Sequence, residues 1–215
     1  MDFSNFSIDG DPESFLISDR YNYSKISTII TEQLARLTVT EKLVVYHLAL
    51  RREPTSMAAL GEHFEIMSLQ GNLASTIDSL IRRSIVQTIG GSNLDRNEVK
   101  CYTLQNVILE LGPDRLRAEL DLELQTPGNL FFFNYLALHP TTSPEYIRQI
   151  QQRLFLNPLS RLLYRRHATE TIAYIRSLIL LAADLKGYAI GNLINLAIEL
   201  NANFTNWDLS NLHIA

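Results

Sequence analysis

The spacing of apolar residues is helical along most of this chain. Apolar side chains that recur every three or four residues share one face of an α-helix and predict a buried stripe. The pattern changes over Ser84–Ile89 and Val99–Leu104, where β-branched residues flank a turn-forming stretch and predict a two-stranded hairpin. Before the hairpin, the predicted helices cover residues 25–37, 39–53, 56–64 and, after a break at Gly71, 73–81.

A start signal for the second of these helices lies at Thr38-Val-Thr-Glu41. This pattern is a capping box: the Thr and Glu side chains each accept a hydrogen bond from the backbone N–H of the other residue, so two otherwise free N–H groups are satisfied. The helix is expected to stop before Pro54, because the residue before a proline avoids the helical conformation. The side chains expected in its buried face are Leu43, Val44, His47 and Leu48.

Helical spacing returns after the predicted hairpin, first over Val107–Leu124. Ser143 as a hydroxyl cap and Pro144 at the first helical position predict another helix through about Phe155, which Pro158 is expected to break. Three further helices are predicted, the first of them short and basic, with Leu159, Leu162 and Leu163. The second is expected to end at Gly187 and carries an apolar stripe of Ile172, Ile175, Leu178, Ile179, Ala182 and Leu185. The third covers Leu193–Leu200.

The last residues repeat every five positions, with Phe204, Leu209 and Ile214 in equivalent places. This period fits neither a helix nor an ordinary strand, and it suits a square β-helix with one apolar residue per side pointing inward. Such a coil needs several turns to bury its axis, and this stretch supplies about half of one. Two explanations stay open: the protein is truncated here, or the remnant caps another structure.

These elements predict a mainly α protein. The three helices at 39–53, 56–64 and 73–81 followed by a β-hairpin wing are the order of a winged-helix domain, after which a helical linker bundle and a pentapeptide-like C-terminal tail follow. The predicted organisation is a flexible acidic leader at 1–24, the winged-helix domain at 25–125, the helical linker at 126–200 and the start of a pentapeptide-like repeat at 201–215.

Composition indicates a folded, soluble protein. Apolar residues make up 46% of the chain and charged residues 20%, and the net charge of −4 provides no general field that attracts nucleic acid. The single cysteine, Cys101, cannot form an internal disulfide, which favours the reducing cytoplasm. The N-terminus lacks the basic start and apolar run of a signal peptide, so no membrane association is expected.

Several segments together resemble cyanobacterial STAND-type signalling proteins, in which an NB-ARC ATPase precedes a winged-helix domain, a helical linker and WD or pentapeptide repeats. The resemblance covers about residues 26–215, and its most specific element is Gly-Tyr-Ala-Ile-Gly-Asn at 187–192. The segments that carry it are Leu37–Leu43, Leu48–Pro54, Leu80–Ile85, Tyr102–Gln105 and Gly187–Leu196.

The resemblance implies the regulatory and coupling segment of such a protein without its ATPase. The winged domain in this superfamily often ends with Met-His-Asp, whose His contacts a nucleotide phosphate. Leu104-Gln-Asn106 holds that place and lacks the His, which argues against phosphate sensing by Gln105. A phosphate-binding loop also needs a glycine-rich turn followed by Lys. None of Lys25, Lys42, Lys100 and Lys186 follows such a turn, so no cofactor is expected.

A winged-helix domain can also bind DNA through its third helix and its wing. The candidate contacts, which are expected to be exposed, are Gln70, Asn72, Ser75, Thr76, Arg82, Arg83, Arg96 and Lys100. Between Thr38 and Leu104, however, seven acidic side chains balance seven basic ones. Because phosphate contacts supply most non-specific affinity for DNA, this balance favours a domain used for packing and protein contacts.

The largest charge asymmetry lies further along the chain. Between Glu145 and Arg176 six arginines face only two acids, and the candidate contacts to phosphate or to an acidic partner are Arg148, Arg153, Arg161, Arg165 and Arg166. The favoured interpretation is a solvated face, or internal pairing with the acidic segment Asp114–Glu123. The aromatic run Leu130–Tyr135 is likewise interpreted as core rather than as a partner-docking patch.

No arrangement of residues indicates an enzyme or a metal site. The five histidines form no HxxxH pair, no GxSxG motif is present, and Asp121 and Glu123 lie two residues apart on a helix, so they point to different faces. The leading hypothesis is a non-catalytic module that binds another protein, such as a separately encoded ATPase or repeat protein. The alternatives are a DNA-binding transcriptional regulator and a degenerate fragment of a larger signalling protein.

Overall fold

The computed structural model of the protein describes residues 26–65, 70–90, 99–126, 128–210 and 212–214. The chain divides into two units at the boundary between Arg36 and Leu37. In the first unit residues 26–35 are helical, with Leu34 buried and Ile26 and Ile29 exposed. The predicted leader at 1–24 lies outside the described residues.

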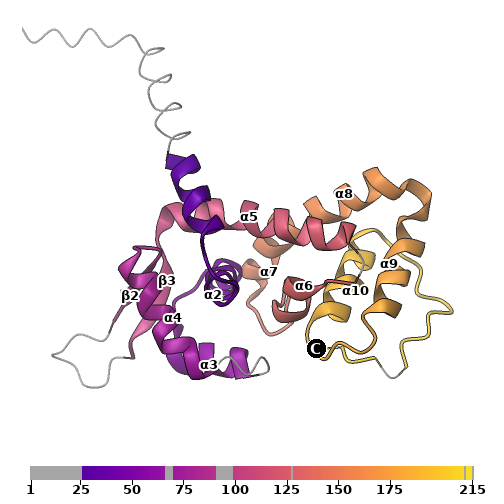
Figure 1. Cartoon of the computed structure of the whole chain (residues 1–215). Helices are drawn as coiled ribbons and strands as arrows, with labels where there is room; N and C mark the ends of the chain where they lie inside the picture. Colours follow the sequence, from indigo (N-terminus) through magenta and orange to yellow (C-terminus); the bar gives the residue numbers. More distant parts are fainter. Residues whose placement is uncertain (1–25, 66–69, 91–98, 127, 211, 215) are drawn as a thin grey trace, which may run out of the picture. The chain divides into compact units, whose positions relative to one another are not determined.

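The second unit is mainly helical with a small antiparallel sheet (Figure 1). Its first elements are α2 (Val39–Arg51), β1 (Thr55–Ser56), α3 (Met57–Glu65), α4 (Gln70–Arg82), β2 (Val86–Ile89) and β3 (Cys101–Leu104). The predicted capping box is confirmed: the Thr38 N–H donates to the Glu41 carboxylate at 2.9 Å, and the Glu41 N–H donates to the Thr38 hydroxyl at 3.2 Å. Leu43, Val44, His47 and Leu48 are all buried, as predicted.

The sheet has three strands in the order β1-β3-β2. The predicted hairpin supplies β2 and β3, with Val86 opposite Leu104, while β1 pairs with the other edge of β3 and places Thr55 opposite Tyr102. The sequence did not indicate β1, because two residues are too short to show an alternating pattern. The predicted break at Gly71 is wrong, because this residue lies inside α4.

The long helix α5 (Asn106–Gln125) connects the sheet to the later helices, packing against α2 and then against α6 (Phe131–Tyr135). Pro113 lies inside α5 and cannot donate to the carbonyl of Leu109, four residues earlier. The guanidinium of Arg52 lies 3.5 Å from that carbonyl oxygen and donates to it instead. The helix therefore continues through its proline.

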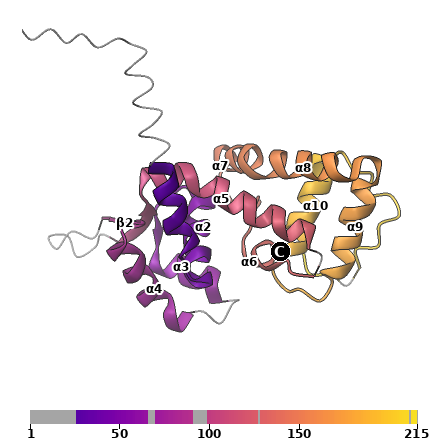
Figure 2. The ribbon, with the colours of Figure 1, turned by 45° about the horizontal axis from the view of Figure 1, so that its top comes forward.

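A second proline is accommodated in a similar way where α7 (Glu145–Gln151), a π-helical segment (Gln152–Leu156) and α8 (Asn157–His167) run on as one helix (Figure 2). The prediction that Pro158 breaks this helix is wrong. The π-helical segment contains one residue more per turn than an α-helix, which gives the proline ring room. Arg117 donates at 3.2 Å to the carbonyl of Leu154, the group that Pro158 leaves without an α-helical donor.

The start of α7 also differs from its prediction. Pro144 is the N-cap residue rather than the first helical residue, and no side-chain hydrogen bond caps the helix, so Ser143 does not have the predicted capping role. The last helices are α9 (Thr171–Leu181), after a short 3-10 turn at Ala168–Glu170, and α10 (Ala189–Glu199). The stripe of α9 is buried at Ile175, Leu178, Ile179 and Ala182, but the helix ends at Leu181, well before Gly187.

After α10 the described residues form recurring turns rather than helix or strand. The Asn203 side chain accepts from the N–H of Thr205 at 2.9 Å, and five residues later Asp208 accepts from the N–H of Ser210 at 3.0 Å. The five-residue period of the sequence is thus matched by a period in the local hydrogen bonds. Within the described part of the chain, no helix is both long and apolar enough to cross a membrane.

Candidate functional site

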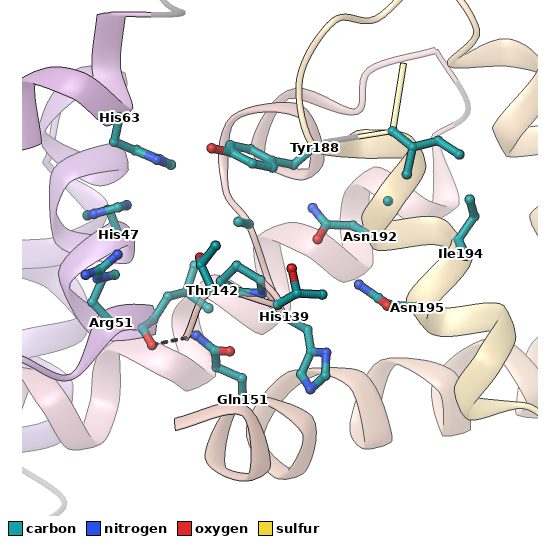
Figure 3. A pocket seen from close by; sticks show the side chains of 16 residues that line it. His47, Arg51, His63, His139, Thr142, Gln151, Tyr188, Asn192, Ile194 and Asn195 are labelled. Carbon is teal, nitrogen blue, oxygen red and sulfur yellow. Dashed lines mark hydrogen bonds between the residues drawn. The ribbon is translucent and has the colours of Figure 1, made fainter. Parts of the chain in front are cut away.

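A cavity of about 380 Å³ lies between α2 and α3 on one side and α10 on the other (Figure 3). Such a volume is within the range of small-molecule sites. The residues between α6 and α7, the end of α7 and Ile214 near the C-terminus complete its lining. The side chains that define its chemistry are His47, Arg51, His63, Gln151, Tyr188 and Asn195.

Two histidines and a tyrosine from three different elements stack along this cavity. The rings of His47 and His63 are 4.0 Å apart between centroids, and Tyr188 lies nearly parallel to His63 at 5.6 Å. The Nε2 atom of His63 is 3.2 Å from the carbonyl oxygen of Tyr135, so this nitrogen carries the proton and donates. One imidazole therefore connects α3, α6 and the segment that leads into α10.

Both stacked imidazoles are neutral at pH 7. Burial lowers the pKa of His47 well below its usual value, and the neighbouring His63 and Arg51 lower it further. Burial likewise lowers the pKa of His63 to about 4; the bond to Tyr135 opposes this shift, while Arg51 adds to it. Burial and the charge of Arg148 also lower the pKa of His139, so Arg51 is the one charged side chain among the described residues that line the cavity, and the lining contains no Asp or Glu.

The Gly-Tyr-Ala-Ile-Gly-Asn segment supplies the α10 side of the cavity, and its residue types have physical reasons. Gly187 and Tyr188 donate their N–H groups to the side chain and to the carbonyl of Asn134, at 3.0 and 2.8 Å. A Cβ atom at position 187 would come within 2.0 Å of that carbonyl oxygen, so only glycine allows this approach.

Asn192, the last residue of the segment, is buried, and both the nitrogen and the oxygen of its side-chain amide form hydrogen bonds. Its amide nitrogen donates to the carbonyls of Phe133 and Leu136 at 2.8 and 2.7 Å, and its amide oxygen accepts from the N–H of Leu138 at 2.9 Å. It therefore fixes the backbone that follows α6 against α10.

Gln151 differs from Asn192 because only half of its amide is used. The residue is 1% exposed, and its Nε2 donates to the carbonyl of Leu50 at 3.0 Å. Its Oε1 has no hydrogen-bond partner among the described residues. Figure 3 shows the amide nitrogen of Gln151 at a dashed hydrogen bond and its amide oxygen directed away from that bond.

The predicted arginine contacts fall into two groups. Arg166 makes two hydrogen bonds of 2.6 Å to Asp121 on α5, the internal pairing that the sequence favoured, and Arg148 pairs with Glu145 on its own helix. Arg153, Arg161 and Arg165 are exposed. Arg161 and Arg165 lie with Tyr164 beside an open hollow of about 410 Å³ at the end of α10.

The candidate DNA contacts are only partly gathered on one surface. Asn72, Ser75 and Arg82 are exposed on α4, and Lys100 is exposed beside β3. The expectation for Thr76 is wrong: it is buried, and its hydroxyl donates to the carbonyl of Asn72 at 2.8 Å. Arg83 pairs with Glu41 at 3.3 Å. The side chain of Gln70 and all of Arg96 lie outside the described residues.

The aromatic run is core, as predicted, with Leu130, Phe132 and Phe133 buried. Glu123 and Asp121 do face different partners: Glu123 accepts from the N–H groups of Phe132 and Phe133 at 2.7 and 3.1 Å, at the start of α6. Within the described ranges, no three His, Cys, Asp or Glu side chains are placed to hold a metal.

Sequence reasoning missed the stack of His47, His63 and Tyr188, and it missed Gln151. The stacked rings come from separate elements, so no local spacing reveals them. The one usable signal was Tyr188 within the segment already singled out at 187–192.

Comparison with known proteins gives one distant relative. The chain is 26% identical to an uncharacterized WD repeat-containing protein of Nostoc sp., over 96% of this chain and 19% of the relative. The chain thus spans about a fifth of the length of that protein. No family model and no solved structure matches this chain. What the comparison establishes is distant similarity to one region of a large cyanobacterial WD-repeat protein.

Proposed function

We propose that this chain is a non-catalytic regulatory module that acts by binding another protein, and that it corresponds to the coupling region of STAND-type signalling proteins. The observation that carries the proposal is the similarity of nearly the whole chain to a small part of a WD-repeat protein. A region used as one segment of a much larger chain works in contact with other domains. Here the corresponding partner is a protein such as an ATPase or a repeat protein.

The arrangement of the sheet supports a winged-helix domain within this module. In the order α2-β1-α3-α4-β2-β3, the first strand pairs with the last, which leaves β2 and β3 as the hairpin wing. The helices from α6 to α10 then form the linker, and the recurring turns after Asn201 support a pentapeptide-like tail.

The contacts around the cavity support a coupling role. The stacking of Tyr188 on His63 joins the start of α10 to α3, and the bonds of Asn192 join α10 to the residues after α6. A partner that displaces α10 would therefore also displace groups packed on the winged-helix part.

The surface proposed for the partner is the exposed side of α8, with Arg161, Tyr164 and Arg165. These side chains combine two guanidinium groups with an aromatic ring that is 58% exposed, a combination that suits an acidic protein surface. No ion pair of either arginine is found among the described residues, and Glu199 also lines this hollow.

Site-specific photo-crosslinking in cyanobacterial cells tests this proposal. A photoreactive phenylalanine at position 164 is expected to capture one protein, and the double variant Arg161→Glu, Arg165→Glu is expected to abolish that product. The same probe at position 72, on exposed α4, serves as the matched control. Equal products at both positions, or tight binding of ATP or ADP by the purified chain in calorimetry, would contradict the proposal.

The second candidate is a DNA-binding regulator, favoured by the exposure of Asn72, Ser75 and Arg82 on α4. The burial of Thr76 and the pairing of Arg83 with Glu41 remove two of its expected contacts. This alternative predicts a retarded duplex whose affinity falls steeply with salt and is weakened in Arg82→Ala, the arginine that stays exposed on α4.

A further inference from the structure

Gln151, in the lining of the cavity between α2 and α10, has a buried acceptor that the described residues do not use. Gln151 is held by its bond to Leu50, so its orientation is fixed, and its Oε1 remains without a partner among the described residues. A buried amide oxygen without a donor costs free energy comparable to a lost hydrogen bond. A molecule that donates to this oxygen would recover that cost.

The charges around the cavity restrict what that molecule is. The lining contains the guanidinium of Arg51 and no carboxylate, and no ion pair of Arg51 is found within the described ranges. A cation placed here would meet no opposite charge, whereas an anion would be paired. The neutral ring of His47, the Asn195 amide and the hydroxyl of Thr142 add polar groups that suit a small polar molecule.

We propose that this cavity is a binding site for a small organic anion that also carries a hydrogen-bond donor, such as a hydroxycarboxylate or a hydroxyl-bearing phosphate ester. The anionic group pairs with Arg51, and the hydroxyl donates to Oε1 of Gln151. Because the ligand then joins α2 to α7 and fills the space against α10, which lines the other side of the cavity, it also strengthens the contact between the two sides.

NMR titration of the whole, isotope-labelled chain tests this site with L-malate as the probe. Saturable shifts are expected at the Gln151 side-chain amide and at backbone amides of 47–51 and 188–195. Succinate keeps the charge but lacks the hydroxyl, and glycerol keeps hydroxyls but lacks the charge, so both are expected to bind more weakly. Glycerol 3-phosphate serves as the phosphate counterpart of L-malate.

Two variants separate the interactions. Arg51→Gln, at an exposed position, is expected to weaken L-malate binding about tenfold, the usual effect of losing a charged hydrogen bond, whereas Arg36→Gln, an arginine outside the cavity, leaves it unchanged. Gln151→Met keeps the volume and is expected to remove the preference for L-malate over succinate.

The proposal is overturned if neither L-malate nor glycerol 3-phosphate shifts the cavity residues up to about 20 mM, where a millimolar complex is saturated. It is also overturned if Arg51→Gln binds L-malate as tightly as the unmodified chain. Because Arg51 is exposed and its replacement does not disturb the core, this second result decides the question even where Gln151→Met fails to fold.

Discussion

The start of α2 and the start of α6 each bury a glutamate, and the two carboxyl groups are held in opposite ways. Burial raises the pKa of Glu41, but the Thr38 N–H, the hydroxyls of Ser79 and Thr38, and Arg83 together bring that pKa below its usual value. Glu123 also accepts from backbone N–H groups, yet burial raises its pKa to about 7, the charge of Glu119 adds to this shift, and no cation among the described residues opposes it.

The difference shows that different kinds of interaction hold the two regions together. Around Glu41 an ionised group joins α2 to α4, since Ser79 donates at 2.8 Å and Arg83 at 3.3 Å. Around α6 the connections are neutral and mostly use backbone groups, through Asn134 and Asn192. Acid should therefore loosen the first region, whereas the second depends on shape and on satisfied amides.

The largest expected effect tests the neutral region. Asn192→Leu leaves two carbonyls and one N–H without a partner, which is expected to lower the free energy of unfolding by about 4 kcal/mol. Chemical denaturation measures the loss, with exposed Asn129→Leu as the control. A cost below about 1 kcal/mol would show that water replaces the amide.

Gly187→Ala is expected to have the next largest effect, a loss of about 3 kcal/mol, because the new methyl group meets the Asn134 carbonyl. Gly61→Ala is the matched control in α3: its Cβ would meet nothing within 4 Å. That change is expected to stabilise the helix by about 0.5–1 kcal/mol. Equal melting shifts in the two variants would contradict the account of Gly187.

The two carboxyl groups predict opposite responses to pH. A folded pKa raised from 4.5 to about 7 means that the stability contributed by Glu123 is present below pH 4.5 and is lost as the pH rises through 7, by about 3 kcal/mol at most. The difference in unfolding free energy between the unmodified chain and Glu123→Gln should change with this sign between pH 4.5 and 8. A difference that is constant over this range would refute the raised pKa.

The smallest expected effect comes from Glu41→Gln, because the amide oxygen still accepts from the Thr38 N–H. A loss of about 1 kcal/mol is expected at pH 7, since the interaction with partly exposed Arg83 is weakened by solvent. Because the pKa of Glu41 is lower in the folded chain than its ordinary value of 4.5, the stability that its carboxylate contributes is fully present above pH 4.5. This stability is lost as the pH falls through the pKa of the folded chain. A difference that grows in acid would contradict this sign.

The same comparison explains how far the sequence could predict the structure. Thr38 and Glu41 are three residues apart, so their reciprocal bonds follow from local spacing alone. Glu123 caps a helix that begins eight residues later, and Asn192 bonds to groups more than fifty residues away. Such contacts depend on how helices pack, which apolar spacing alone does not specify.

The candidate site shows the same limit. The segment at 187–192 was recognisable, but His47 and His63 belong to different helices and gave no joint pattern. The error at Pro158 has a related cause: the sequence shows a residue that cannot donate, but not that Arg117 of another helix serves the carbonyl it leaves. Both outcomes depend on groups supplied from elsewhere in the fold.

The π-helical segment at Gln152–Leu156 also sets the angular position of everything on α8. It amounts to one surplus residue in an otherwise α-helical path, and each residue of an α-helix turns the chain by about 100°. Shortening the segment by a single residue would rotate Leu159 and Leu163 out of the interior and carry Arg161 and Arg165 to another side. The direction in which Arg161 and Arg165 face is therefore set by how many residues this segment contains, and not by which residue types they are.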